Sequence, residues 1–379
     1  MKRWGAIILC LGLLWSGAVP AAAAAMPETE AVGAVLMEKE TGAVICAKGE
    51  HEQLEPASVT KVMTLLLTME AIDEGRLHYE DLLTASAHAA SMGGSHVYLA
   101  EGEQMSVEDL LKAVCMASGN DAAVCLAEGL AGSEEQFAER MNARAAELSM
   151  NDTHFVNCTG LPAEGHVTSA MDLAILSREL ILHHPDIRRF TTVWMDTLRD
   201  GTFQLANTNK LIRFYDGATG LKTGSTDAAK YCLSATAERN GMELIAVVLK
   251  APTSVERFES AKRLLNYGFA NYTLLEVYPD RALPVIPVSM GRQDTVQPVP
   301  AAENALLLEK TQVPDVEKSL ELLEEISAPV AEGQQLGTLR LTAGGTILAE
   351  LPIVAGEAVE RVSYWDIVQK FLLDSIFAV

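Results

Sequence analysis

The chain has 379 residues, enough for two or three domains with a sizeable core. Its composition, with 49% hydrophobic and 21% charged residues, is that of an ordinary globular protein. The formal net charge of −22 argues against binding to nucleic acid, which requires a basic face, and equally against polybasic attachment to anionic lipid.

The N-terminus has the pattern of an export signal. Lys2 and Arg3 precede an apolar stretch at 5–19, and the alanine-rich run 20–25 offers several small-residue cleavage sites. The apolar stretch is too short to span a bilayer comfortably. We therefore predict a signal peptide at 1–25 and a protein that acts at the extracytoplasmic face of the cell membrane or in the cell wall.

A first domain is predicted over residues 26–275. Hydrophobic periodicity and turn residues indicate, in chain order, a hairpin at 31–48, a helix at 59–75, two helical stretches within 105–132 interrupted at Ser118–Asn120, helices at 133–150 and 169–184, two strands within 231–251 and a helix at 254–272. This order of elements favours an α/β or α+β domain in which helices cover an antiparallel sheet.

The character of the sequence changes after residue 275. Short β-like runs broken by Pro and Gly predict a small all-β, sandwich-like domain at 276–358. A helix is predicted at 359–379, with an apolar face that includes Tyr364 and Trp365. Two interpretations of that face are open: peripheral contact with a membrane, and docking on the β domain.

Cysteine and histidine usage gives no support for a metal centre. Five cysteines remain after the signal peptide, at irregular spacing, and we interpret them as mostly buried apolar residues, with one disulfide still possible. No cysteine pair has zinc-site spacing, and there is no H-E-x-x-H motif. We expect neither a metal nor another cofactor.

Three short motifs could carry chemistry. Ser58 is the only serine with a lysine three positions on, at Lys61, and residues so spaced share a helix face. A desolvated lysine can take the proton of a serine hydroxyl, although helix capping by Ser58 and an outward-pointing Lys61 would explain the same letters. "SGN" at 118–120 follows 60 residues later, and "KTG" at 222–224 follows Ser118 by 104 residues. Alone, "SGN" could be an ordinary helix break, and "KTG" could be an exposed strand end with a turn glycine.

The three motifs in this order resemble the S-x-x-K, S-x-N and K-T-G set of penicillin-recognising serine enzymes. The surrounding "PASVTKVMT", "SGNDAAVCLAE", "FVNCTGL", "DGATGLKTGST" and "YCLSATAERNGMELIAVVL" are similar to the low-molecular-weight penicillin-binding proteins that are D-alanyl-D-alanine carboxypeptidases of peptidase family S11. The resemblance covers nearly the whole mature chain, and it implies a penicillin-binding-protein or β-lactamase-like transpeptidase fold.

The resemblance also implies roles for individual residues. Ser58 would be the acylated nucleophile and Lys61 its general base, and Ser118 and Asn120 would position substrate and relay protons. A further group would bind substrate along one strand, with the backbone N–H groups of Ser58 and Ser225 as the oxyanion hole: Lys222, Thr223, Gly224 and Ser225. The substrate would be a peptidoglycan stem peptide ending in D-Ala-D-Ala, and β-lactam antibiotics would be covalent inhibitors.

Two positions bear on how this chain would recognise the substrate carboxylate. Many relatives have an arginine between two asparagines before the K-T-G strand, where this chain has Thr208. Arg257 matches another arginine that some relatives use for the substrate carboxylate, although a solvated helix charge explains it equally well.

A serine β-lactamase and a non-catalytic penicillin-binding sensor are alternative functions. Glu164, in a Gly- and Pro-rich loop, is the nearest candidate for the deacylating glutamate of a β-lactamase.

Overall fold

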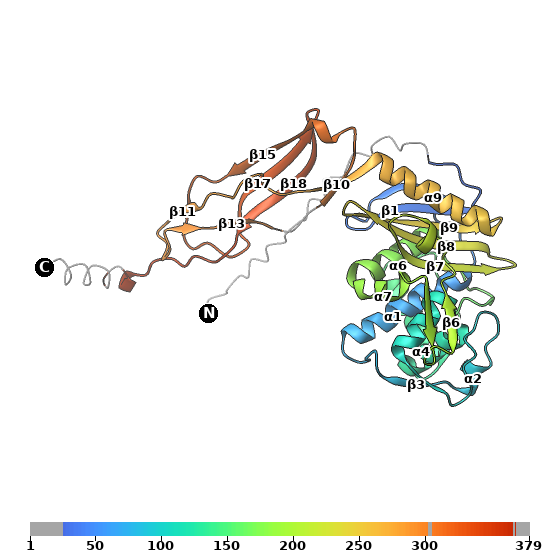
Figure 1. Cartoon of the computed structure of the whole chain (residues 1–379). Helices are drawn as coiled ribbons and strands as arrows, with labels where there is room; N and C mark the ends of the chain where they lie inside the picture. The colour runs from blue at the N-terminus through green and yellow to red at the C-terminus, as the bar shows by residue number, and fades with distance from the viewer. Residues whose placement is uncertain (1–25, 302–304, 367, 369–379) are drawn as a thin grey trace, which may run out of the picture.

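The computed structural model describes residues 26–301, 305–366 and 368. These residues form a compact part built of helices and a sheet, followed by an elongated part built of strands (Figure 1). Strand β10 (Tyr272–Glu276) follows directly on the last long helix and leads from the first part into the second.

A five-stranded antiparallel sheet organises the first part. Its strand order is β2-β1-β9-β8-β7, so that β7 lies at one edge and β2 at the other. The apolar letters of β9 run nearly without interruption because helices cover both faces of the sheet. The strands are β1 (Gly33–Glu38), β2 (Val44–Lys48), β7 (Ala218–Thr226), β8 (Lys230–Arg239) and β9 (Met242–Ala251).

Alternation along the strands divides the core into two layers. Side chains such as Val35 and Val247 pack on one face against a helical cluster that holds most of the buried residues. Side chains such as Leu36 and Val248 pack on the other face beneath α9 (Ser254–Asn271). The large cluster contains α1 (Lys61–Asp73), α3 (Val107–Lys112), α4 (Asn120–Ala131), α5 (Glu134–Glu147) and α6 (Ala170–His183).

Shorter elements surround these layers. Ser106, Ser133, Ser169 and Thr253 accept hydrogen bonds from the first turns of α3, α5, α6 and α9, so serine and threonine caps fix where these helices begin. The remaining elements are η1 (Ala57–Thr60), α2 (Ala87–Ala90), η2 (Ala113–Ala117), η3 (Pro185–Ile187), α7 (Arg188–Thr191), α8 (Leu211–Phe214), and two small antiparallel sheets. One pairs β3 (Leu82–Thr84) with β4 (Gln104–Ser106), and the other pairs β5 (Met195–Leu198) with β6 (Phe203–Ala206).

The C-terminal part consists of small sheets. The sheets have the orders β13-β18-β17-β15, β12-β11-β16 and β10-β14, and two small apolar cores lie among them. The strands are β11 (Ile286–Ser289), β12 (Thr295–Val296), β13 (Pro298–Pro300), β14 (Ala305–Glu309), β15 (Val316–Leu322), β16 (Ile326–Ser327), β17 (Gln335–Ala343) and β18 (Thr346–Ala355), with the single 3-10 turn η4 (Val313–Asp315).

The fold class expected from the sequence is confirmed, with helices on an antiparallel sheet followed by a β-rich part. The expected helix at 59–75 differs at its start, because Ala57–Thr60 form a 3-10 turn before α1 begins at Lys61. The two-stranded sheets β3–β4 and β5–β6 were missed, since their strands are three or four residues long and partly exposed. Most of the helix predicted at 359–379 lies outside the described residues, which show helix only at 364–366 and 368.

Three further observations concern the described residues alone. The cysteines at 46, 115, 125, 158 and 232 are free and buried, as the composition argument expected. Within the described ranges, no group of His, Cys, Asp and Glu side chains is arranged to hold a metal ion. Within the same ranges, no helix combines the length and the apolar character needed to cross a bilayer.

Candidate active site

The S-x-x-K motif lies on a tight turn that leads into a buried helix. Ser58 is the second residue of η1 and is half-buried, whereas Lys61 is the first residue of α1 and is completely buried. Ala57 has the left-handed backbone conformation, with φ of 48°, which is uncommon for a residue other than glycine. The turn therefore leaves the serine accessible while the lysine points into the protein. A capping serine with an outward-pointing lysine is excluded.

Three oxygen atoms surround the Lys61 amine. Its Nζ lies 2.6 Å from Asn120 Oδ1, 2.7 Å from the Thr159 carbonyl oxygen and 3.1 Å from Ser58 Oγ. A neutral amine has two N–H donors and one lone pair. The two short contacts are to atoms that can only accept, so in the neutral amine they use both donors. The lone pair is then left for the Ser58 hydroxyl.

Burial lowers the pKa of Lys61 to about 7 from the ordinary lysine value of 10.5. The opposing influences, which raise this pKa, come from Cys158, Asp121 and Glu134, and they are smaller than the loss of hydration. A lysine with this pKa is neutral in a large fraction of molecules near pH 7. It therefore meets the electrostatic requirement for a general base.

The S-x-N motif occupies a break between two buried helices. The chain passes through the π-helical segment η2 and turns at Ser118, whose φ is 62°, before α4 begins at Asn120. Asn120 donates from Nδ2 to the Gly93 carbonyl at 2.7 Å, which fixes its Oδ1 toward Lys61. The next residue, Asp121, is buried and accepts the backbone N–H groups of Val97 and Leu99 at 3.0 Å. These bonds tie the 93–99 loop to the motif.

The K-T-G motif lies on the edge strand β7. Lys222 is buried and donates from Nζ to Ser118 Oγ at 2.8 Å and to the Thr223 carbonyl at 2.9 Å, so the second and third motifs are in direct contact. Burial holds the pKa of Lys222 well below its usual value, and the nearby Lys61 lowers it further.

Gly224 is required by the close approach of β7 to the nucleophile turn. A Cβ atom at this position would lie 2.8 Å from the Ser58 backbone nitrogen and 2.9 Å from the Pro56 carbonyl oxygen. No side chain fits in that space. The following residue, Ser225, is exposed at the same strand edge.

The segment 157–160 supplies the third contact of Lys61. Asn157 Oδ1 accepts the backbone N–H groups of Thr159 and Gly160 at 3.2 and 2.7 Å, which folds the segment into an asparagine-capped turn. Gly160 has φ of 81°, and a Cβ there would lie 1.9 Å from the Ala57 carbonyl oxygen. This turn therefore packs directly against the nucleophile segment and presents the Thr159 carbonyl to Lys61.

Arg257 lies behind β7 and is not a solvated helix charge. It is 7% exposed, and its guanidinium donates to the Gly224 carbonyl at 3.1 Å and the Cys232 carbonyl at 3.3 Å. Burial lowers its pKa to about 10. Its Nε is buried without a hydrogen-bond partner. On the same strand, Thr223 Oγ1 donates to Thr208 Oγ1 at 2.8 Å.

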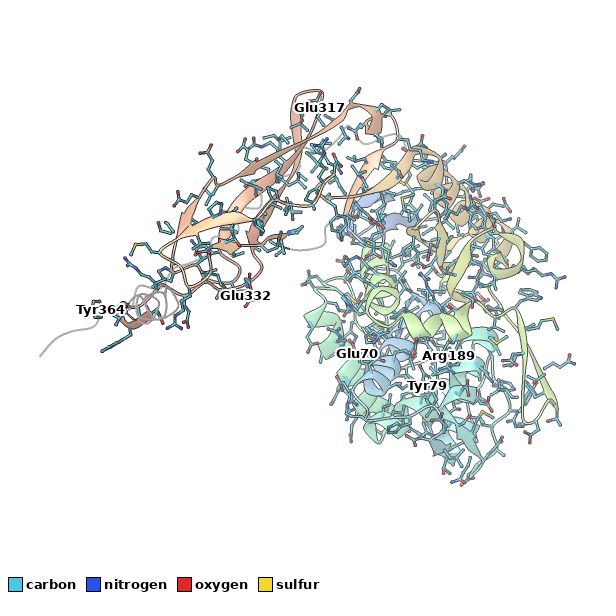
Figure 2. The ribbon with its side chains drawn as sticks, turned by 60° about the vertical axis from the view of Figure 1, so that its left-hand side comes forward. Glu70, Tyr79, Arg189, Glu317, Glu332 and Tyr364 are labelled. Atoms are coloured by element: carbon cyan, nitrogen blue, oxygen red, sulfur yellow. The ribbon has the colours of Figure 1, made fainter. Side chains whose placement is uncertain are left out.

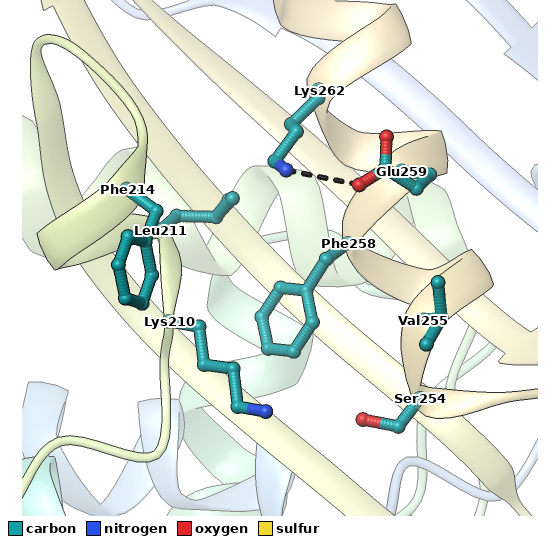
Figure 3. A pocket seen from close by; sticks show the side chains of 8 residues that line it. All are labelled: Lys210, Leu211, Phe214, Ser254, Val255, Phe258, Glu259 and Lys262. Carbon is teal, nitrogen blue, oxygen red and sulfur yellow. Dashed lines mark hydrogen bonds and ion pairs between the residues drawn. The ribbon is translucent and has the colours of Figure 1, made fainter.

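A pocket of about 230 Å³ opens between α8 and the start of α9, next to Arg257 in the sequence. Figure 3 shows the Lys210 ammonium and the Ser254 hydroxyl pointing toward each other across it, with the rings of Phe214 and Phe258 beside them. Ser254 Oγ accepts a hydrogen bond from Arg257 at 3.3 Å, which connects this pocket to the back of β7.

The structure thus brings Ser58, Lys61, Ser118, Asn120 and Lys222 into one connected group, and places Thr223, Gly224 and Ser225 on the adjoining strand edge. Sequence reasoning missed Thr159, Gly160 and Asp121 as parts of this group. A backbone carbonyl such as that of Thr159 gives no signal in its side chain. The asparagine and glycine of "FVNCTGL" are turn-forming residues, and a tight turn could have been predicted from them.

The fold and this group of residues define a class of protein. An antiparallel sheet whose edge strand carries K-T-G, next to a half-buried S-x-x-K serine and an S-x-N turn, is the arrangement of the penicillin-recognising serine enzymes.

Comparison with known proteins identifies the family within this class. A family model described as D-alanyl-D-alanine carboxypeptidase matches residues 20–253, and one described as the C-terminal domain of penicillin-binding protein 5 matches residues 280–361. The chain is 42% identical over 350 residues to D-alanyl-D-alanine carboxypeptidase DacF of Bacillus subtilis, covering 91% of this chain and 90% of that protein. Penicillin-binding protein 5 of Haemophilus influenzae has a similar structure, with a TM-score of 0.78 and 29% identity over 89% of this chain and 100% of that chain. The ampicillin-bound form of penicillin-binding protein D2 of Listeria monocytogenes is 34% identical, with a TM-score of 0.59 over 64% of this chain and 98% of that chain.

The chain belongs to the D-alanyl-D-alanine carboxypeptidase family. It is a serine peptidase that acts on D-Ala-D-Ala termini in peptidoglycan.

Proposed function

We propose that Ser58 is the acylated nucleophile of this carboxypeptidase and that Lys61 is its general base. The observation that carries the proposal is the set of contacts around Lys61 Nζ, because the two acceptor-only atoms direct the lone pair of the neutral amine at Ser58 Oγ. Ser118, in contact with Lys222, supplies a second hydroxyl for proton transfer.

The reaction follows from this arrangement. Ser58 Oγ attacks the carbonyl carbon of the penultimate D-alanine, and its proton moves to Lys61 Nζ. The carbonyl oxygen becomes an oxyanion that the backbone N–H groups of Ser58 and Ser225 stabilise. The tetrahedral intermediate then collapses and the peptide C–N bond breaks. The proton held by Lys61 is relayed through the Ser118 hydroxyl, which takes it up as it gives its own proton to the departing amine of the terminal D-alanine. Water hydrolyses the ester and regenerates Ser58.

Substrate binding is proposed along the free edge of β7. An extended stem peptide would add to the sheet as a sixth strand, opposite β8. Thr223 and Arg257 would orient the terminal carboxylate, because the bond of Arg257 to the Gly224 carbonyl brings its positive charge to the strand that carries Thr223. Mass spectrometry of the products of a purified stem pentapeptide tests the function. Loss of one D-alanine is expected, and an unchanged pentapeptide would contradict it.

β-Lactams are proposed as covalent inhibitors that acylate Ser58. The ampicillin-bound form of the Listeria relative supports this. Glu164, the candidate for a deacylating base, is exposed on its loop. An exposed carboxylate does not hold a water molecule against a buried ester.

We expect a penicilloyl adduct that persists much longer than one turnover of the peptide substrate. Intact-mass measurement at intervals after a brief pulse of penicillin checks this, with Glu164→Gln as the matched control, which should leave the lifetime of the adduct unchanged. Loss of the adduct within seconds, with hydrolysed drug accumulating, would show that the enzyme turns the drug over as a β-lactamase does.

We also propose that the protein is exported and that its C-terminal segment contacts the membrane surface. The charged and apolar pattern of residues 1–25 supports export. Tyr364 and Trp365 are 75% and 72% exposed, and Figure 2 shows Tyr364 at the end of the β-rich part that lies away from the helical part. Exposed neighbouring aromatics suit the membrane interface.

Removing residues 364–379 is expected to shift the protein from the membrane fraction to the soluble fraction without changing its activity on a soluble peptide. This boundary keeps Val359 and Arg361, whose backbones pair with Val330 and Gly291 in the β-rich part. The double variant Tyr364→Ser, Trp365→Ser is the sharper form, because it alters only exposed side chains. Unchanged fractionation of both variants would favour docking on the β domain.

A further inference from the structure

The peptide group between Ala57 and Ser58 has two functional ends. Its N–H belongs to Ser58 and is one of the proposed oxyanion-hole donors. As the second residue of η1, Ser58 carries an N–H of the kind that a helix start leaves without an intrahelical acceptor. Its C=O belongs to Ala57 and points to the opposite side of the peptide plane. Whatever holds that carbonyl therefore also orients the N–H.

The Ala57 carbonyl is held by a buried hydroxyl. Thr60 is completely buried, and its Oγ1 donates to the Ala57 carbonyl oxygen at 2.8 Å. Gly160 encloses the same oxygen from another side, since even a Cβ atom there would lie 1.9 Å away. These contacts keep Ala57 in its left-handed conformation, with φ of 48°.

A buried histidine fixes the direction of the Thr60 hydroxyl. The Val156 N–H donates to His166 Nδ1 at 3.0 Å, so Nδ1 carries no proton and the neutral ring has its hydrogen on Nε2. Nε2 lies 2.8 Å from Thr60 Oγ1 and must donate to it. His166 is 3% exposed and packs edge-on against Phe155, with the ring centroids 5.8 Å apart.

These groups form a chain of hydrogen bonds in which every donor points in the same direction. The order is Val156 N–H, His166, Thr60, the Ala57–Ser58 peptide and then the oxyanion. Hydrogen bonds aligned in this manner polarise one another, so the Ser58 N–H becomes a stronger donor. Burial also lowers the pKa of His166 to about 4, which keeps the ring neutral and the chain intact at neutral pH.

We propose that Thr60 and His166 are positioning residues that hold and polarise the Ala57–Ser58 peptide, so that its N–H stabilises the oxyanion formed during acylation. This inference rests on the proposed function, because it requires acylation at Ser58. Neither residue touches the substrate. They act through the backbone of the nucleophile turn.

The first test separates the hydroxyl of Thr60 from its bulk. Thr60→Val keeps the volume and removes the hydroxyl, whereas Thr60→Ser keeps the hydroxyl and removes a methyl group. Removing an oxyanion donor outright slows enzymes by about 10²–10³-fold, so weakening one should slow penicillin acylation and peptide kcat by roughly tenfold. We expect this loss in Thr60→Val, with KM unchanged, and near-normal rates in Thr60→Ser.

The second test applies the same logic to the histidine. His166→Gln offers an amide that can accept from Val156 and donate to Thr60, so it should retain most of the activity. His166→Leu fills the space without either bond and should slow acylation as Thr60→Val does. Because both residues act through the same chain of hydrogen bonds, the double variant Thr60→Val, His166→Leu should be little slower than either single variant.

A spectroscopic measurement distinguishes this role from a purely structural one. The carbonyl stretch of a ¹³C-labelled penicilloyl ester reports the strength of the hydrogen bonds to its oxygen. It should move to higher wavenumber in Thr60→Val and His166→Leu, and stay in place in Thr60→Ser. An unchanged stretch with normal acylation in Thr60→Val would overturn the proposal. Mass spectrometry that still finds the adduct on Ser58 would show that the nucleophile assignment stands independently.

Discussion

Ser58→Ala is expected to fold normally and to lose nearly all release of D-alanine. Removing the nucleophile of a serine hydrolase lowers kcat by several orders of magnitude, so a loss of roughly 10⁴-fold or more is expected. Ser58 is half-buried, and its hydroxyl contacts only the Lys61 amine among the side chains that the structure describes, so little packing is lost. Release of D-alanine from a stem pentapeptide measures the effect, and circular dichroism verifies folding.

Covalent labelling gives the decisive control for this variant. Wild-type protein should gain the mass of one penicillin molecule on the peptide that contains Ser58, and Ser58→Ala should gain none. Ser91→Ala, at an exposed serine, is the matched control and should label normally. A labelled Ser58→Ala protein, with the adduct on another serine, would show that the nucleophile was assigned to the wrong residue.

Lys61 variants are expected to lose most acylation whether or not they keep the positive charge. Lys61→Met keeps the length of the side chain but has no base, and Lys61→Arg keeps the charge but cannot give up its proton near neutral pH. Loss of a general base typically lowers the rate by about 10²–10⁴-fold, and we expect both variants to fall in that range. An active Lys61→Arg enzyme would mean that Lys61 contributes charge alone.

The pH profile of the wild-type enzyme provides an independent check on the base. Burial lowers the pKa of Lys61 to about 7, and only the neutral amine can accept the Ser58 proton. Acylation should therefore be slow at pH 5, rise through about pH 7 and level off above it. A rise in the acylation rate centred near pH 10.5, the ordinary pKa of lysine, would show that the amine is not desolvated in the working enzyme.

The contacts around Lys61 join three segments that lie far apart in the sequence. Ser58 is three residues away, but Asn120 and Thr159 are 59 and 98 residues distant. Spacing alone could place Ser58 and Lys61 on one helical face. The packing of α4 and the 157–160 turn against α1 gives the amine its two acceptor-only partners. Because of these partners, the amine directs its lone pair at the serine.

The contacts of Arg257 and Ser118 in the fold show roles that their positions in the sequence do not indicate. In the sequence, Arg257 follows the start of an amphipathic helix, where a charge usually faces water. In the fold, α9 packs against β8 and β9, and the Arg257 guanidinium reaches the Gly224 carbonyl on the neighbouring strand β7. Ser118 similarly looks like part of a helix break, and only the contact with Lys222, 104 residues later, connects it to the K-T-G strand.

The sequence by itself determined the class of fold, the order of the main helices and strands, and the three motifs. Those features depend on local properties: hydrophobic period, turn residues and short spacings such as Ser58 to Lys61. The tertiary structure alone decided which groups complete the site. Loss of hydration in the closed core lowers the Lys61 pKa, and the close approach of β7 to η1 requires Gly224. The chain from His166 through Thr60 to the Ser58 N–H likewise exists only where residues more than one hundred positions apart meet. Desolvation and contact are properties of the packed protein, and no local pattern of residues encodes them.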